Sequence, residues 1–412
     1  MMDTNQVPVG TSTESLWRSR DFLALWVGQI VSTLGTANSA TALPLLVLAV
    51  TGSPADAGMI GAVTALPALA VQLPAGALVD RWNRRTVMLV CELLAGLALL
   101  AVPTTLWLGR PGLFLLAIAV VVQRGSAVFF GSAQHAALPA IVPDSLLSDA
   151  IAQNEAKSRA AGLLGPPLGG LLFGVGRAVP FLVDGATSLA AAAGLLVVRS
   201  NLRPVRDSAP QSVWRESAHG LTWIWHHSLI RIAILLIALS NLVFEALALT
   251  LVVLAREHGT SSARIGLMFG IYGAGGVLGA LVAPKLRPLL SPKTVIVAAN
   301  WLWAGLLPLF LLTTNPLLLG TLGAASAFVG PLWNVVITTY LIMLVPDELR
   351  GRVTSAAMAM ATSVLPLASA LAGYSLAAFG PSWTLCAIAL VMLATAVAGS
   401  LSPAIRRAPS GT

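Results

Sequence analysis

Long apolar stretches alternate with short polar segments along almost the whole chain. A helix of about twenty apolar residues spans the roughly 30 Å hydrocarbon core of a bilayer. Twelve stretches come close to or exceed this length, so the pattern predicts an all-α membrane protein with twelve spans. Their predicted extents are 22–50, 57–79, 86–108, 113–136, 153–176, 179–198, 231–254, 265–284, 294–313, 316–344, 354–378 and 381–402.

The composition agrees with lipid surroundings. Hydrophobic residues make up 57% of the 412 residues and charged residues only 10%, and the mean hydropathy is +0.85. A soluble domain has about 25% charged residues, so these charges cannot cover the surface of a soluble protein of this length. The expected partner of the chain is therefore the lipid bilayer.

Several classes of function are excluded by missing motifs. Cys91 and Cys386 lie in separate apolar runs, and the five histidines have no ligand spacing, so neither a disulfide framework nor a metal site is expected. The sequence contains no phosphate-binding loop and no readable pair of nucleophile and base. Basic residues are scattered instead of clustered, which argues against nucleic acid. We expect a non-enzyme without cofactors.

The distribution of basic residues predicts the orientation in the membrane. The polar segment 1–20 lacks the apolar core of a signal peptide and is expected to be a cytoplasmic tail. With this orientation most Lys and Arg residues fall on the cytoplasmic side. The external side then holds Arg110, Arg177, Arg256 and Arg264. The positive-inside rule therefore predicts that both termini are cytoplasmic.

The longest polar stretch follows the sixth predicted span and divides the chain. It predicts an N-terminal six-helix half over 1–198, a cytoplasmic central loop over 199–230 and a C-terminal six-helix half over 231–412. The part of this loop over 212–225 is rich in Trp and Ile. Two readings of it stay open, a short helix at the inner membrane surface and a plain linker.

The two predicted halves share sequence matches at one fixed offset of 203 residues. The matched pairs are GALV at 76–79 and at 279–282, IVPD at 141–144 with LVPD at 344–347, and Gly170 with Gly373. Three matches at one offset indicate two homologous halves in parallel orientation. Such a repeat is typical of secondary transporters.

A motif at the inner end of the second span resembles a signature of the major facilitator superfamily. Residues 76–85 read GALVDRWNRR, where that family has G-x-L-A-D-R-x-G-R-K, with Asn83 in place of the glycine and Arg85 in place of the lysine. The resemblance implies a conformational role for Gly76, Asp80, Arg81, Arg84 and Arg85. An alternative is a positive anchor without a moving role.

The fifth span carries a second element, which resembles the GPxxGG motif of the antiporter branch of that superfamily. It consists of Gly165, Pro166, Gly169 and Gly170. Proline bends a helix and glycines allow a neighbour to pack closely, so plain helix packing is the alternative reading. The resemblance implies export from the cell.

Further matches cover nearly the whole chain, among them DFLALW at 21–26, DGATS at 184–188 and VPDELRGR at 345–352. Together they resemble the bacterial drug exporters that include macrolide-efflux and enterobactin-exporter-like proteins. The resemblance implies a monomer in the bacterial inner membrane that handles small molecules and protons. Many relatives have Gly-Asp in the first span, whereas this chain has Gly35-Thr36, so a proton-carrying acid is missing there.

Charged side chains within the spans are the main candidates for function, because each costs about 3 kcal/mol in lipid. Arg124 and Glu245 are expected near the midplane of the fourth and seventh spans. Glu92 and Asp184 are expected closer to the ends of their spans, and the alternative for them is a structural role, either paired with another group or reaching toward the membrane surface. In the resembled family, spans one, four, seven and ten line the central cavity. Polar residues that these spans present are Gln29, Thr33, Thr36, Asn241, Asn334 and Thr338.

The family arrangement also predicts two cytoplasmic latches between the halves. Asp80 is expected to face Arg352, and the basic residues Lys285 and Arg287 are expected to face Asp144 and Asp149. Their predicted task is to hold the inner gate closed in the outward-open state. The alternative is a set of exposed ion pairs worth about 0–1 kcal/mol each.

The sequence thus predicts a secondary transporter that exports an amphipathic or lipophilic small molecule, such as a drug-like compound or secondary metabolite, by proton antiport. Proton coupling is assigned to Glu245 with Arg124, because Glu245 is the acid expected near the midplane of a cavity span. Alternatives are a siderophore or lysophospholipid transporter of the same fold and a non-transporting membrane receptor or scaffold.

Overall fold

The computed structural model describes residues 16–79, 81–109, 112–200, 202, 213–286 and 289–407, and these form helices and turns without any strand. The N-terminal helices are α1 (Arg20–Thr51), α2 (Pro54–Val79), α3 (Arg84–Trp107), α4 (Leu113–Ile141), α5 (Leu147–Val175) and α6 (Val179–Val197). The later helices are α7 (Val213–His226), α8 (Ser228–Glu257), α9 (Ser262–Leu286), α10 (Pro292–Leu306), α11 (Pro316–Leu344), α12 (Asp347–Thr362), α13 (Leu365–Leu401) and α14 (Pro403–Arg406). Short 3-10 helices cover Leu16–Arg18, Asp144–Leu146 and Leu307–Leu312.

The described helices are consistent with the twelve predicted spans. Ten segments are long and apolar enough to cross a membrane, and one of them runs over Leu349–Leu401. That segment turns at Gly380, whose φ of 78° and following Pro381 end one helix and start the next. Helix α5 is not among the ten, because charged residues near its start and its Gly and Pro residues lower its hydropathy.

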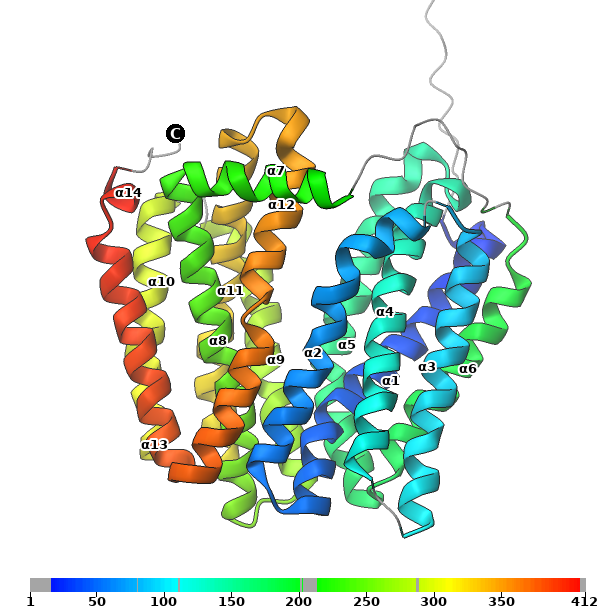
Figure 1. Ribbon diagram of the computed structural model, residues 1–412, viewed down its shortest axis with the longest axis horizontal. Coiled ribbons are helices and arrows are strands. Elements are labelled where there is room, and N and C mark those ends of the chain that lie inside the picture. Colours follow the sequence, from blue (N-terminus) through cyan, green and yellow to red (C-terminus); the bar gives the residue numbers. More distant parts are fainter. Residues whose placement is uncertain are drawn as a thin grey trace, which may run out of the picture.

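The helices form two groups that pack in the same way. In the first group α1 packs against α5 and α6, and α4 against α2 and α3. In the second group α8 packs against α12 and α13, and α11 against α9 and α10. The two groups stand side by side and diverge toward the end that bears α7, here named the α7 end (Figure 1). This repeated packing agrees with two pseudo-symmetric halves of six spans.

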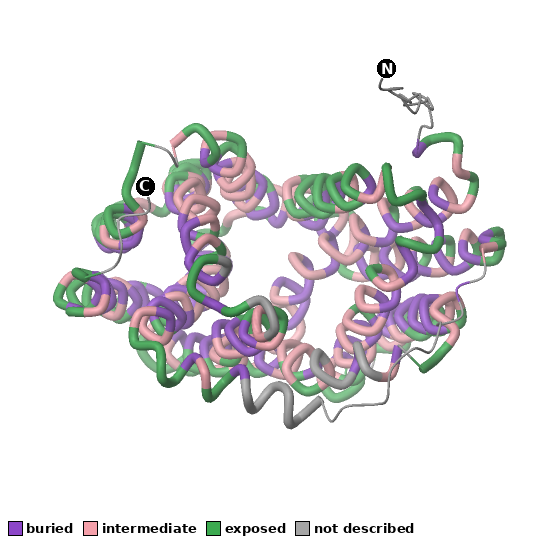
Figure 2. The backbone as a smooth tube through the Cα atoms, turned by 90° about the horizontal axis from the view of Figure 1, so that it is seen from above, coloured by how far each residue is buried: buried purple, intermediate pink, exposed green. Residues whose placement is uncertain are grey.

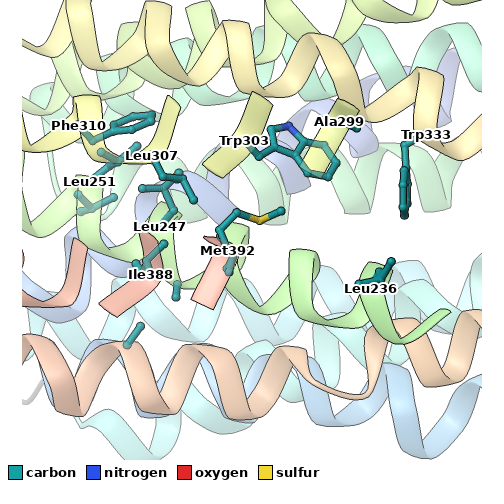
Figure 3. Packing of buried hydrophobic residues seen from close by; sticks show 14 of the residues in the cluster. Leu236, Leu247, Leu251, Ala299, Trp303, Leu307, Phe310, Trp333, Ile388 and Met392 are labelled. Atoms are coloured by element: carbon teal, nitrogen blue, oxygen red, sulfur yellow. The ribbon is translucent and has the colours of Figure 1, made fainter. Parts of the chain in front are cut away.

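The outer surface of the helices is apolar. Large side chains such as Leu97, Phe114, Leu281 and Leu390 are exposed, and exposed residues follow the outward faces of both helix groups (Figure 2). The interior of the C-terminal group is also apolar, with Trp303, Leu307 and Met392 among the packed residues (Figure 3). A protein that is apolar both inside and outside fits a lipid environment.

The two groups meet through paired glycines at the end opposite α7, here named the closed end (Figure 1). A Cβ atom added to Gly58 of α2 would lie 2.6 Å from the Cα of Gly373 of α13, and one added to Gly170 of α5 would lie 2.7 Å from the Cα of Gly266 of α9. Neither crossing has room for a side chain. The helices touch here through their backbones.

The segment between the two groups contains a helix and is not only a linker. Helix α7 is strongly amphipathic and packs against α12, where the backbone of Gly220 approaches that of Arg352. The last turn of α7 contacts the residue that precedes α8, because the rings of Trp223 and His227 stack with centroids 3.6 Å apart. Residues 203–212 lie outside the described residues, so the boundaries of the predicted central loop stay a prediction.

Candidate functional site

A central cavity of about 280 Å³ lies between the two helix groups and contains both predicted midplane charges. Arg124 comes from α4 and Glu245 from α8, so each group contributes one charge. The remaining wall is mostly apolar. It is lined by Ala40, Thr41, Leu43, Pro44, Ala57, Gly61, Thr64, Pro166, Ala248, Leu249, Val252, Phe269 and Ser369. Such a lining, apolar with few polar groups, is typical of small-molecule sites.

Glu245 and Arg124 share this cavity without direct contact. The Ser369 hydroxyl of α13 donates a hydrogen bond of 2.8 Å to Glu245 Oε1. No ion pair joins Arg124 to Glu245, both of which lie in the described part of the chain. The two groups nevertheless interact electrostatically. Arg124 and Glu245 therefore lie in one cavity without an ion pair between them.

A second, polar cavity of about 210 Å³ lies within the N-terminal group and holds three of the predicted lining residues, Gln29, Thr33 and Thr36. Gln29 does not face the central cavity, because its amide donates a hydrogen bond of 2.8 Å to Glu92. Ser32 donates to the same carboxylate at 3.1 and 3.2 Å. This polar cavity is named the N-half cavity below.

Lys157 of α5 also takes part in the N-half cavity, and the sequence analysis did not single it out. Its side chain is buried, lines the cavity and interacts electrostatically with Glu92. The sequence signal that could have identified Lys157 as a cavity residue is its position about two turns before Gly165 on α5. That spacing places both residues on the side of the helix that faces the N-terminal core.

The other predicted lining residues lie in the C-terminal group, away from the central cavity. Asn241 donates a hydrogen bond of 2.8 Å to the carbonyl of Ala361 and borders a cavity of about 160 Å³ together with Asn334. Asn334 and Thr338 also border a wider cavity of about 610 Å³, which is lined by α9, α11 and Arg159 of α5 and therefore reaches from one group to the other. The structure thus does not gather the predicted polar residues into one site.

The glycine-rich element of α5 serves two different contacts. Gly165 and Gly169 pack against Ala37 and Asn38 of α1, and Gly170 forms the crossing with α9 at the closed end. Pro166 borders the central cavity. The element therefore places α5 between the core of its own group and the interface with the other group.

The predicted latches are open or lie outside the described residues. Asp144, Asp149 and Lys285 are exposed near the α7 end, where the groups diverge, and no ion pair joins these described residues. Asp80, the acid of the first latch, and Arg287 of the second latch lie outside the described residues. The latches stay a prediction for a conformation in which the α7 end is closed.

Arg85 binds within the N-terminal group. Its guanidinium donates hydrogen bonds of 3.0 and 2.7 Å to the carbonyls of Leu195 and Leu196, which end α6. A cation at a helix C-terminus satisfies free carbonyls and the helix dipole. Of the other arginines in the motif, Arg84 is the first residue of α3, and Arg81 lies in the turn before α3 and is exposed.

We expect Arg85→Ala to lower the free energy of unfolding by about 1 kcal/mol, because charged hydrogen bonds to the last carbonyls of α6 are lost. Thermal unfolding of the purified protein in detergent measures this change. The matched control is Arg81→Ala, which removes an exposed arginine of the same motif. Equal loss of stability in both variants would contradict the capping role of Arg85.

The sequence matches known proteins along almost its whole length. A family model described as "Transmembrane secretion effector" matches residues 11–408. The "Multidrug efflux pump Tap" of Mycobacterium tuberculosis (strain ATCC 25618 / H37Rv) is 28% identical over 409 residues, which cover 94% of this chain and 94% of that protein. The protein of the same name from Mycolicibacterium fortuitum is 28% identical over 394 residues, with 91% and 94% covered.

Solved structures show the same fold at low sequence identity. The nucleoside transporter NupG is 13% identical and superposes with a TM-score of 0.76, covering 94% of this chain and 99% of its own. A bacterial homologue of the iron transporter ferroportin is 17% identical with a TM-score of 0.70, covering 94% and 100%. With the match over 11–408, the chain belongs to the transmembrane secretion effector family of the major facilitator superfamily of membrane transporters.

Proposed function

We propose that this transporter exports lipophilic or amphipathic small molecules, drug-like compounds or secondary metabolites, across the bacterial inner membrane by proton antiport. The similarity to proteins named multidrug efflux pumps supports export of such compounds. The observation on which the proposal rests is the central cavity, where apolar walls from both halves enclose one cation and one acid.

The shape of the molecule fits an inward-open state. The excess of Lys and Arg supports a cytoplasmic location of the α7 end, and this is the end at which the halves diverge (Figure 1). The paired glycines then close the external end. Export requires the reverse state, in which the latch of Lys285 with Asp144 and Asp149 closes the cytoplasmic end.

Glu245 is the coupling acid in this proposal. A carboxylate in an apolar cavity is stabilised as an anion only while a cation is close. We therefore assign the proton that is exchanged to Glu245, with Arg124 as the neighbouring cation of the same cavity. Substrate enters the same cavity, so that proton and substrate occupy it alternately.

Dye accumulation in cells that lack their own exporters tests the proposal. Expression of the protein is expected to lower the cellular content of a lipophilic cationic dye such as ethidium, because outward transport opposes passive entry. A protonophore is expected to cancel the difference. Net uptake caused by expression would contradict export, and insensitivity to the protonophore would contradict proton coupling.

A pair of arginine variants distinguishes transport from a receptor or scaffold role. Arg124→Gln removes the cation of the central cavity and is expected to abolish the difference in dye content. Arg264→Gln changes an exposed arginine at the start of α9 and is expected to leave it unchanged. Equal dye content with both variants would remove Arg124 from the mechanism.

A further inference from the structure

The N-half cavity holds two opposite charges that do not pair with each other. Glu92 of α3 and Lys157 of α5 both line this space of about 210 Å³, and the two residues are only 6% and 8% exposed. No ion pair joins these two described residues. A buried charge without a close partner is costly in a membrane interior. The cavity therefore offers one charge of each sign to a group that lies between its walls.

The two charged side chains differ in the hydrogen bonds that they already have. Glu92 accepts hydrogen bonds from the Gln29 amide at 2.8 Å and from the Ser32 hydroxyl at 3.1 Å. The Lys157 ammonium, which can only donate, has no hydrogen bond or ion pair to any residue that the structure describes. The amide nitrogen of Gln134 lines the same cavity and is also buried without a hydrogen-bond partner. The lysine side of the cavity thus lacks an acceptor.

The charges of the N-half cavity determine which chemical group fits it. An anion alone would satisfy Lys157 but would add a second negative charge beside Glu92. A cation alone would leave the Lys157 ammonium without an acceptor. A group that carries both an ammonium and a carboxylate places an opposite charge at each wall and keeps the site neutral. The volume allows a group of this kind, since one water molecule takes about 30 Å³ in the liquid.

The N-half cavity and the central cavity follow one another along α1. Thr33 and Thr36 line the first, and Ala40 and Pro44 line the second. This spacing keeps all four residues on one side of the helix. Thr36 and Ala40 are about one turn apart, a rise of about 6 Å. A molecule with a short flexible chain can therefore place one end in each cavity.

We propose that the N-half cavity binds the zwitterionic end of an amphipathic substrate, whose carboxylate contacts Lys157 and whose ammonium contacts Glu92. The apolar end of the same molecule lies between the apolar walls of the central cavity. This inference rests on the proposed function and narrows its substrate class to amphipathic compounds with both charges at one end. Glu92 and Lys157 bind substrate in this scheme, and the exchanged proton stays assigned to Glu245.

Three dansyl compounds with matched chains test the charge requirement. Nε-dansyl-lysine carries an ammonium and a carboxylate, dansylcadaverine lacks the carboxylate, and dansyl-aminohexanoic acid lacks the ammonium. Dansyl fluorescence measures their binding to the full-length protein in lipid nanodiscs, and protein-free nanodiscs give the background. We expect the protein to bind Nε-dansyl-lysine about tenfold more tightly than either analogue, because each analogue loses one charged hydrogen bond.

Two variants assign each charge of the probe to its wall. Lys157→Gln is expected to weaken binding of Nε-dansyl-lysine and of the anionic analogue about tenfold, but not binding of the cationic analogue. Glu92→Gln is expected to weaken binding of Nε-dansyl-lysine and of the cationic analogue instead. The matched controls Lys293→Gln and Glu257→Gln change exposed residues and are expected to leave all three affinities unchanged. Equal weakening of all three probes in Lys157→Gln and Glu92→Gln would show a merely structural role and overturn the assignment.

The comparison of probes in the unmodified protein decides the inference even where a variant fails to fold. Equal affinities for the three compounds would mean that the N-half cavity holds water only and would overturn the zwitterion site. Ethidium export in the dye accumulation experiment, found together with equal affinities, would overturn this site and leave the proposed function intact. Net uptake of ethidium would contradict the proposed function and with it the assignment of this cavity to an exported substrate.

Discussion

Replacing Glu245 by glutamine is expected to abolish uphill export while substrate exchange continues. Glutamine resembles the protonated acid in shape and charge, so the central cavity stays intact and can still bind substrate on either side. It cannot release a proton. In proteoliposomes with a pH gradient of one unit, a one-for-one exchange supports about a tenfold gradient of a cationic dye, and this gradient is expected to vanish in Glu245→Gln.

The control for this prediction lies on the same helix. Glu257 is exposed at the end of α8, so Glu257→Gln makes the same chemical change outside the cavity and is expected to retain the gradient. Counterflow of labelled dye measures exchange in both variants. A normal uphill gradient in well-expressed Glu245→Gln would remove this acid from the coupling mechanism.

A leucine at Gly170 is expected to prevent closure of the external end and to reduce transport strongly. The Cβ atom alone would lie 2.7 Å from the Cα and 2.8 Å from the nitrogen of Gly266, and backbone atoms of a packed helix cannot move aside. Overpacking of this kind costs about 1–3 kcal/mol, which corresponds to about a 5- to 150-fold loss of the externally closed state. Transport should decrease by a similar factor.

The same helix provides the control for the glycine substitution. Gly174 has no atom within 4 Å of an added Cβ, so Gly174→Leu changes size and apolarity equally without a clash. A cysteine placed in the closed end, such as Ser262→Cys, should react with an external thiol reagent faster in Gly170→Leu than in Gly174→Leu. Equal labelling would show that the crossing does not determine closure.

Helix positions could be predicted from the sequence because each span carries its own apolar signal. The turn at Gly380 was placed correctly between the predicted spans 354–378 and 381–402, since Gly-Pro interrupts an apolar run. Helix α5 begins at Leu147, six residues before the predicted span 153–176. Its first turn contains Asp149 and lies in a polar stretch that continues the helix beyond the apolar core.

The partners of polar residues could not be predicted, because periodicity identifies a face of a helix but not the neighbour that it meets. Helix α1 carries Gln29, Ser32, Thr36 and Ser39 on one broad face, which the structure divides between Glu92 and Asp184. The rotation of α1 depends on close contacts such as Gly35 against α6. Such contacts depend on the packing of the whole group.

The contact between Asp184 and α1 also affects how the chain is inserted during synthesis. Helix α6 has only 19 residues, of which Asp184 is the sixth, and an aspartate costs up to about 2.5–3.5 kcal/mol in an inserting helix when it lies at the centre. This cost falls when Thr36 and Ser39 are already in place as hydrogen-bond donors. We therefore expect α6 to insert more efficiently when α1 is already in the membrane than when α6 is presented alone.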